Sequence, residues 1–272
     1  MWELAAGVVV TAASLSLPMF GVHQQALPRV AIALDQQHTI FALDPSHGHA
    51  NLTEQITTAQ VIVLSYSIPL LGHAIVQYHR PMLFATRDFV LGLSVSTAMA
   101  QLATNILKIT TGRFRPNFYA MCHWDSSNTT PWDGTSNLCT LAVGELEGRQ
   151  SFPSGHTSCA FSTLAFFSLY LVGRAHRDTR QRGRSSRHRM GAFGWASLPL
   201  LLALWVGVTR YQDKWHHTDD VLAGAVIGAG CAYAAHSCYF VLFQVDRKHA
   251  DEDPISTDGY STLPCVADAV AV

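Results

Sequence analysis

The chain has 272 residues, of which 49% are hydrophobic and 14% are charged, and its formal net charge is −1. Soluble domains carry about 25% charged residues, so this composition argues against an ordinary soluble protein. The near-zero net charge gives no reason to expect a nucleic-acid partner, and we expect one domain whose apolar surface is covered partly by lipid.

Six apolar segments are long enough to cross the hydrocarbon core of a bilayer, which takes about 20 helical residues. In chain order they are residues 4–22, 59–76, 89–107, 157–173, 191–208 and 221–243. The first could be a cleaved signal peptide, but Glu3 stands where such peptides are positively charged, which favours a retained helix. The last segment carries Gly224 and Gly228, a spacing that suits close helix packing.

These segments predict the fold class, an all-α integral membrane bundle of six transmembrane helices formed by residues 1–245. Residues 246–272 begin with a polar stretch and predict a disordered cytoplasmic tail. Between the fourth and fifth segments, seven arginines lie from Arg174 to Arg189. Each would cost about 2.5–3.5 kcal/mol at the bilayer centre, so this run is an aqueous loop. It is better explained as a topology signal that touches anionic lipid than as a nucleic-acid site.

The positive-inside rule makes that arginine-rich loop cytoplasmic. Alternation then places both termini in the cytoplasm and three connections on the luminal or extracellular face, at residues 21–58, 108–156 and 209–220. The long connection between helices 3 and 4 is one of them. Several cations on this outer face run against the positive-inside bias, and binding of phosphate would explain them, because guanidinium forks match its oxygens. These cations are Lys108, Arg113, Arg115, Arg149, Arg210 and Lys214.

Three short pieces of the outer connections fit together. They are "KITTGRFRP" from Lys108 to Pro116, "PSGH" from Pro153 to His156, and "TRYQDKWHHTDD" from Thr209 to Asp220. In this order they resemble the signature of the type 2 phosphatidic acid phosphatase superfamily, in its lipid phosphate phosphatase and diacylglycerol pyrophosphate phosphatase branch. The resemblance runs from the second to the sixth segment, and "FALDPSHGHANLTEQI" at residues 41–56 matches more loosely. Thr209 departs from the usual serine but keeps a hydroxyl.

The residue chemistry suggests three catalytic roles. His216 is the expected nucleophile, since an imidazole can attack phosphorus and form a phosphohistidine. Asp220 follows four residues later, and at the start of a helix this spacing puts it on the same face, where it would hold one ring nitrogen. The resemblance assigns His156 as the general acid that protonates the leaving alkoxide and later takes a proton from water.

The phosphate-binding group follows from the same pieces. Cations would surround the phosphoryl oxygens, while the residues that open the fourth helix would cap it and direct backbone amides at the anion. Pro116 is expected to stop the third helix, so that the preceding arginine turns into the site. The expected binding residues are Lys108, Arg115, Ser154, Gly155 and Arg210.

A metal site is the competing interpretation of "HHTDD", because His216, His217, Asp219 and Asp220 are all suitable ligands. The surrounding cations would oppose a divalent ion, and the resemblance implies a family that works without metal or other cofactor. We therefore predict no metal ligands.

The outer connections also contain cysteines and sequons. Cys122 and Cys139 lie in the same loop and predict a disulfide in an oxidising lumen. Asn128 and Asn51 begin glycosylation sequons, the second of them close to the membrane.

The resulting hypothesis is a multi-pass membrane enzyme that hydrolyses lipid phosphates through His216. The substrates of the resembled family include phosphatidate, lysophosphatidate, diacylglycerol pyrophosphate and sphingoid-base phosphates. Two alternatives stay open: a relative acting on a sugar phosphate or polyprenyl diphosphate, and a catalytically inactive lipid-binding membrane protein. The expected partners are the lipid substrate and the bilayer; an oligomer is compatible with the sequence, and the endoplasmic reticulum, vacuole and plasma membrane fit equally.

Overall fold

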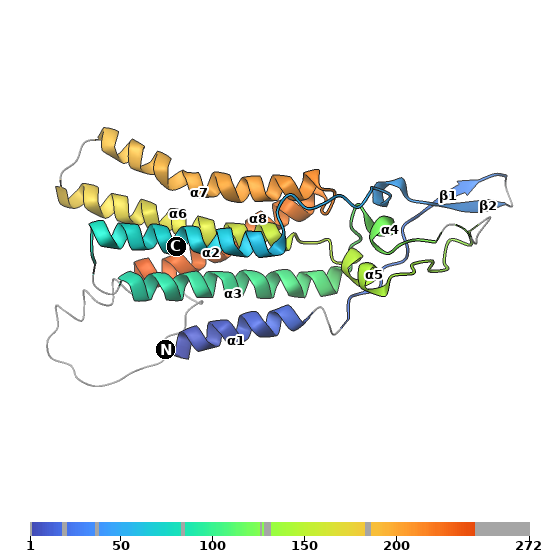
Figure 1. Ribbon diagram of the computed structural model, residues 1–272, viewed down its shortest axis with the longest axis horizontal. Helices are drawn as coiled ribbons and strands as arrows, with labels where there is room; N and C mark the ends of the chain where they lie inside the picture. The colour runs from blue at the N-terminus through green and yellow to red at the C-terminus, as the bar shows by residue number, and fades with distance from the viewer. Residues whose placement is uncertain are drawn as a thin grey trace, which may run out of the picture.

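Six elongated helices lie side by side in the computed structural model (Figure 1), which describes residues 2–17, 21–35, 38–82, 85–125, 127, 132–182 and 186–242. The predicted tail and Asn128 lie outside these ranges. The helices are α1 Trp2–Ser16, α2 Thr58–His79, α3 Ala85–Thr111, α6 Gly155–Arg182, α7 Ser186–Gln212 and α8 Thr218–Ser237, and a π-helical turn at Cys238–Leu242 extends the last.

Five of these helices are long and apolar enough to cross a membrane among the described residues. They correspond to the second to sixth predicted segments and support a multi-pass membrane protein. The first predicted segment is also a helix, but α1 has 15 residues, about 22 Å at 1.5 Å per residue, against roughly 30 Å for a hydrocarbon core. It packs on α3, where Asn105 Nδ2 donates to the carbonyl oxygen of Ser14 at 2.9 Å.

Polar side chains link the helices inside the bundle, beside buried apolar clusters that include Phe89, Phe166 and Leu164, as in other bundles of transmembrane helices. Ser96 Oγ on α3 donates to the carbonyl oxygen of Ser162 on α6 at 2.7 Å, and Thr104 Oγ1 donates to Ser158 Oγ at 2.9 Å. Other large apolar side chains point outward; examples are Ile62, Val63, Leu71, Leu201, Leu204, Leu222 and Val226.

Small residues bring α8 against α6. A Cβ added to Gly224 would lie 2.6 Å from the carbonyl oxygen of Ser154, and one added to Gly228 would lie 2.5 Å from that of Ser158. Both distances are too short for a real side chain. The small-residue spacing therefore serves packing within the chain, and it fixes the start of α8 beside the start of α6.

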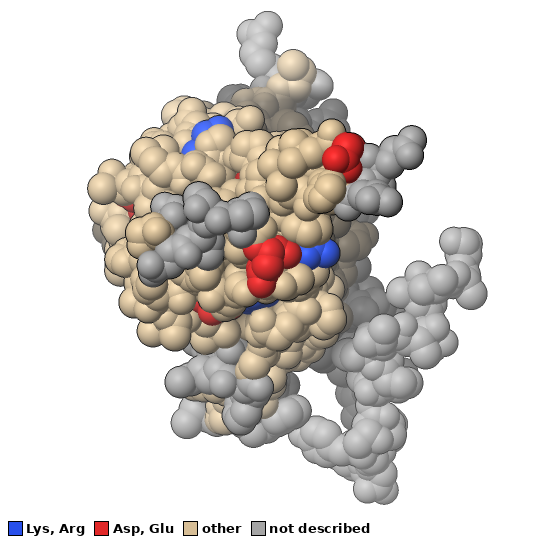
Figure 2. All heavy atoms as spheres, turned by 90° about the vertical axis from the view of Figure 1, so that its right-hand side faces the viewer, with Lys and Arg blue, Asp and Glu red and all other residues tan. Residues whose placement is uncertain are grey.

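All three connections predicted on the outer face gather at one end of the bundle, at the right in Figure 1. They contain a hairpin of β1 Arg29–Ala33 and β2 Thr39–Leu43, the 3₁₀ turn Pro45–His47, and the short helices α4 Phe118–Met121 and α5 Ala142–Gly148. The all-α prediction lacked this hairpin, whose β-branched and aromatic residues favour strands. Figure 2 views this end and shows a few small basic and acidic areas, two of opposite charge lying side by side, on a mostly uncharged surface.

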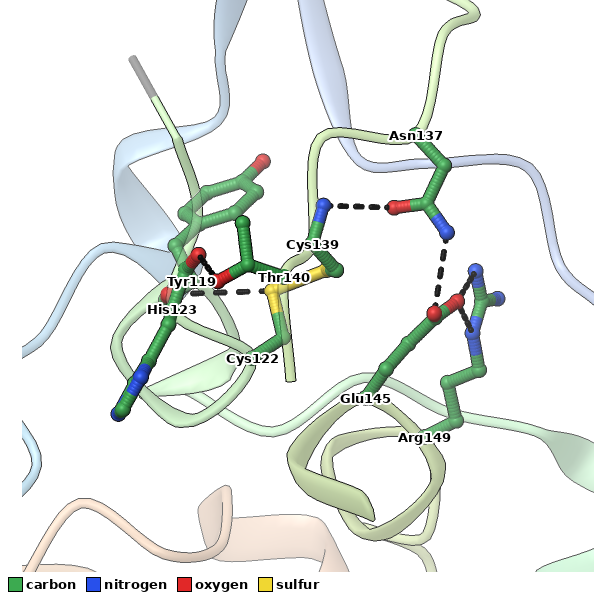
Figure 3. The surroundings of a disulfide bond; sticks show 8 residues. All are labelled: Tyr119, Cys122, His123, Asn137, Cys139, Thr140, Glu145 and Arg149. Carbon is green, nitrogen blue, oxygen red and sulfur yellow. Dashed lines mark hydrogen bonds and ion pairs between the residues drawn. A yellow bond between two sulfur atoms is a disulfide. The ribbon is translucent and has the colours of Figure 1, made fainter. Parts of the chain in front are cut away.

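A disulfide bond joins Cys122 and Cys139, whose Cα atoms are 5.0 Å apart. Figure 3 shows how this loop is tied to α5. Asn137 accepts from the amide of Cys139 at 3.1 Å and donates to Glu145 Oε2 at 3.0 Å. Glu145 Oε1 in turn accepts from Arg149 Nε and Nη2, at 3.1 and 3.0 Å. The disulfide loop and α5 are thus joined to each other by hydrogen bonds at this end of the bundle.

Candidate active site

The three sequence pieces meet around one cavity of about 220 Å³, at the end of the bundle where the three connections gather. Six of the predicted site residues line it: Lys108, Arg115, Gly155, His156, Arg210 and His216. The other lining residues are Glu54, Thr58, Val61, Ile62, Gln101, Asn105, Glu147, Cys159 and Trp215. The predicted convergence of residues distant in sequence is therefore present in the fold.

The end of α3 determines where the first piece points. α3 ends at Thr111, and Gly112 follows with φ +60°, a left-handed conformation typical of the residue after a helix. A side chain at Gly112 would also collide with the carbonyl oxygen of His23. The prediction that Pro116 stops this helix was wrong, because the glycine ends it four residues earlier.

Arg115 is held from both sides. Its backbone amide donates to the carbonyl oxygen of Gly148 at 2.8 Å, which ties it to the end of α5. Its guanidinium lies 4.8 Å from the centre of the Trp215 ring, and Nη2 is 3.5 Å from Glu147 Oε1. Nε and Nη1 are buried without a hydrogen-bond partner. Two unpaired donors on a side chain that is 5% exposed are costly, and an anion in the cavity would satisfy them.

His216 is buried with one ring nitrogen engaged. Nδ1 lies 2.7 Å from the backbone carbonyl oxygen of Ser151. A carbonyl oxygen can only accept, so Nδ1 carries the proton and Nε2 keeps its lone pair. Burial lowers the pKa of His216 to about 4, the charges of Arg115 and Lys108 act in the same direction, and Asp220 opposes them only in part. The ring is therefore neutral at neutral pH, with an available nucleophilic nitrogen.

Asp220 is close to His216 but is not its hydrogen-bond partner. Its Oδ2 lies 3.7 Å from His216 Nδ1, accepts from Ser151 Oγ at 2.6 Å and accepts from the amide of His217 at 2.9 Å. The expected helical face is absent because α8 begins at Thr218, after His216. Asp220 instead orients the ring through Ser151, whose hydroxyl it binds and whose carbonyl holds the imidazole.

Arg113 completes this network, although it matched no position of the signature. Its Nη1 donates to Asp220 Oδ1 at 2.9 Å and also pairs with Asp219. The carbonyl oxygen of Arg113 accepts from the amide of Ser151 at 3.0 Å. The available signal was its place two residues before Arg115 in the first piece. Ser151 was missed because it lies just before the "PSGH" piece and contacts His216 through its backbone carbonyl, which no pattern of side chains indicates.

The start of α6 forms another wall of the cavity. His156 Nε2 is buried and has no hydrogen-bond partner, so it is available to a bound group. A Cβ added to Gly155 would sit 3.7 Å from Lys108 Nζ, which shows how close that ammonium approaches the helix start. Ser154 does not line the cavity: its Oγ accepts from Thr157 Oγ1 at 2.9 Å and from the Thr157 amide at 3.5 Å. Ser154 therefore occupies the position that the sequence analysis expected for the cap of this helix.

Arg210 is fully buried and already paired. Nη1 donates to Glu54 Oε1 and Nη2 to Asp213 Oδ2, each at 2.9 Å. Asp213 also accepts from the amide of Gln55 at 2.9 Å, so this pairing ties residues 54–55 to the end of α7. The sequence assigned no role to Glu54 or Glu147, although Glu54 falls within the loosely matching stretch before α2. An anion entering the cavity would replace Glu54 as a partner of Arg210.

The side chains of "HHTDD" contact different partners and do not gather around one point. His217 Nε2 lies 3.2 Å from the carbonyl oxygen of Phe114, and Asp219 pairs with Arg113. Among the residues that the structure describes, no three His, Cys, Asp or Glu side chains are grouped to hold a metal ion.

Of the two predicted glycosylation sequons, the one at Asn51 lies within the described ranges. Asn51 is exposed, and its Oδ1 accepts from Asn117 Nδ2 at 3.1 Å.

Comparisons with known proteins cover the part of the chain that contains the three sequence pieces. The model of the PAP2 superfamily matches residues 89–244, which contain all three pieces. The chain is 30% identical over 254 residues to the probable diacylglycerol pyrophosphate phosphatase 1 of Schizosaccharomyces pombe, covering 89% of this chain and 82% of that protein. It is 35% identical over 181 residues to lipid phosphate phosphatase 1 of Arabidopsis thaliana, covering 66% of this chain.

Mouse phospholipid phosphatase 1 is 32% identical over 179 residues, covering 64% of this chain and 59% of that protein. The alignments with three Arabidopsis relatives span 52%, 60% and 57% of those proteins' own lengths. No solved structure matches the chain.

Proposed function

Because this chain belongs to the PAP2 superfamily, we propose that it is a lipid phosphate phosphatase that works through a phosphohistidine. The observation that carries the proposal is the state of His216: a buried, neutral imidazole whose Nδ1 is bonded to the Ser151 carbonyl, which leaves Nε2 as a nucleophile. Around it, the cavity gathers the cations that a phosphoryl group requires.

In the first step, Nε2 of His216 attacks phosphorus and forms an N–P bond while the bond from phosphorus to the ester oxygen breaks. Arg115, with two unpaired donors, and Lys108 stabilise the charge on the transferring phosphoryl oxygens. His156 donates a proton to the leaving alkoxide, which departs as an alcohol. The imidazolium that forms on His216 is stabilised by Asp220, whose carboxylate is 3.7 Å from Nδ1.

In the second step, His156 takes a proton from a water molecule as that water attacks phosphorus. The N–P bond breaks, inorganic phosphate leaves, and His216 recovers its neutral form. Arg113 and Ser151 act as positioning residues, since they hold Asp220 and the His216 ring without lining the cavity. The reaction balances without a metal or other cofactor, and we propose that none takes part.

The proposed membrane arrangement has six spans, with α1 as the shortest, the active site on the luminal or extracellular face, and both termini in the cytoplasm. A lipid substrate suits the cavity because Ile62 on α2 lines it and is 47% exposed on the apolar flank of the bundle. A headgroup could thus enter while its acyl chains remain in the bilayer. The names of the relatives, which mention lipid phosphate, phospholipid and diacylglycerol pyrophosphate, favour this class.

A phosphate-release panel on the purified protein tests this function. The substrates are phosphatidate, lysophosphatidate, diacylglycerol pyrophosphate, a sphingoid-base phosphate, a polyprenyl diphosphate and a hexose phosphate, each assayed in excess EDTA. We expect release from the glycerol- or sphingoid-based lipids to exceed that from the hexose phosphate by at least about 10²-fold, with no loss in EDTA. Preference for the hexose phosphate or polyprenyl diphosphate would favour the related enzyme classes, and rescue by added metal would overturn metal independence.

A pH profile tests the protonation state of the nucleophile. The folded-state pKa of His216 is lowered to about 4, so the neutral, reactive form persists as pH falls from 7 and is lost only through the folded pKa. Once corrected for ionisation of the substrate phosphate by ³¹P NMR, kcat/KM should stay level down to about pH 5 and then fall. An acid limb centred near the ordinary histidine pKa, about 6.5, would contradict a buried neutral nucleophile.

A further inference from the structure

A second cavity, of about 710 Å³, lies at the opposite end of the bundle from the candidate active site, at the left in Figure 1. It is bordered by the last turn of α2 and the residues after it, the second half of α6, and α7 near Trp195. It shares no lining residue with the first cavity. Its size falls within the roughly 300–1,000 Å³ of ordinary ligand pockets.

Arginine side chains are prominent in the lining of the second cavity. Three arginines line it, Arg80, Arg174 and Arg177, together with one carboxylate, Asp178. Arg80 forms an ion pair with Asp178. Guanidinium groups on a cavity wall suit a bound anion, because they pair with carboxylate or phosphate oxygens.

Arg174 carries the strongest sign of a missing ligand. Its Nη2 donates to the backbone carbonyl of Arg80, and its guanidinium carbon lies 5.9 Å from the centre of the Tyr170 ring. These contacts orient the guanidinium on the cavity wall. Its Nη1, however, is buried with no hydrogen-bond partner. A buried donor without a partner is costly, and the oxygen of an entering anion would remove that cost.

The remaining walls of the second cavity are apolar and reach the flank of the bundle. Val76 and Leu171 line its interior, while Trp195 and Met82 line it and are 74% and 38% exposed. Tryptophan is favoured where the hydrocarbon core meets the headgroup region. A ligand that is anionic at one end and apolar at the other would match both parts of this lining.

We propose that the second cavity binds the headgroup of an anionic membrane lipid. The arginines would contact its phosphate, since guanidinium forks pair with phosphate oxygens two at a time, and the acyl chains would pass Trp195 along the outside of α7. Basic pockets between transmembrane helices hold lipid headgroups in this manner. The site is a binding site distinct from the active site, and it does not depend on the proposed reaction.

Native mass spectrometry of the purified full-length protein tests the proposal. The probe is phosphatidylglycerol, a phosphodiester that a monoesterase does not hydrolyse, with phosphatidylcholine as the zwitterionic comparison. We expect wild type to retain phosphatidylglycerol in preference to phosphatidylcholine, and Arg174→Gln to weaken that retention about five- to tenfold. Arg174→Lys keeps the charge but loses the fork, and should lie between them.

Arg87→Gln is the matched control, because Arg87 is an exposed arginine near the same end of the bundle that does not line the cavity. It should retain phosphatidylglycerol as wild type does. Equal losses in the Arg87 and Arg174 variants would reduce the effect to general surface charge and overturn the site. Displacement of the lipid by millimolar inorganic phosphate would identify free phosphate as the ligand and overturn the lipid assignment. Unchanged hydrolysis by Arg174→Gln shows that the variant is folded.

Discussion

We expect His216→Gln to insert into membranes normally and to lose phosphatase activity by a factor on the order of 10⁴ or more. Glutamine has nearly the volume of histidine and can still donate to the Ser151 carbonyl, so the buried site keeps its packing. Its amide cannot form the N–P bond, because the nitrogen lone pair is delocalised into the carbonyl. The loss should appear in kcat, with little change in the binding of a substrate analogue.

Trapping the intermediate connects this loss to the mechanism. Brief incubation with a ³²P-labelled lipid phosphate, followed by an alkaline quench, should label wild type through an acid-labile bond and leave His216→Gln unlabelled. His217→Gln is the control: it changes the adjacent histidine, whose ring faces the carbonyl of Phe114 and not the cavity. Label that persists in His216→Gln, or activity near that of wild type, would remove His216 as the nucleophile.

Arg115→Lys should lower kcat/KM by about 10²- to 10³-fold, the usual effect of removing one well-placed donor from a charge-stabilising site. Lysine keeps the positive charge but replaces a planar fork by a single ammonium. The structure leaves Nε and Nη1 of Arg115 unpaired and holds the guanidinium against Trp215. The geometry of the fork, more than the charge alone, is therefore what the substitution removes, and inhibition by vanadate should weaken in parallel.

Arg29→Lys provides a matched control for this substitution. Arg29 on β1 also stacks over an aromatic ring, 4.8 Å from the centre of Phe41, but it lies in the hairpin outside the cavity. Its replacement should leave kcat/KM within about twofold, as is usual for surface changes. If both variants lost activity equally, the effect would reflect damage to the outer part of the fold, and the role assigned to Arg115 would fail.

Much of the bundle could be predicted because membrane insertion depends on local properties. A run of apolar residues marks a span wherever it lies in the chain, and five predicted spans reappear as long apolar helices. Helix ends were less predictable: α3 ends at Thr111, just before Gly112, whose left-handed backbone suits glycine, and not at the more conspicuous Pro116. The hairpin was missed because its strands are short and lie inside a connection between apolar segments.

The amino-acid sequence was enough to predict five membrane-spanning segments and six residues that line the cavity, because apolar runs and the order of the three pieces can be read directly along the chain. How those side chains are held, in contrast, follows from the folded arrangement of distant segments. The Ser151 carbonyl selects the tautomer of His216, and Glu54 occupies Arg210, through hydrogen bonds between segments 65 and 156 residues apart. A hydrogen bond forms only when donor and acceptor are placed to within a few tenths of an ångström. The packing of α6, α8 and the connections beside them sets these positions, and no local sequence pattern encodes them.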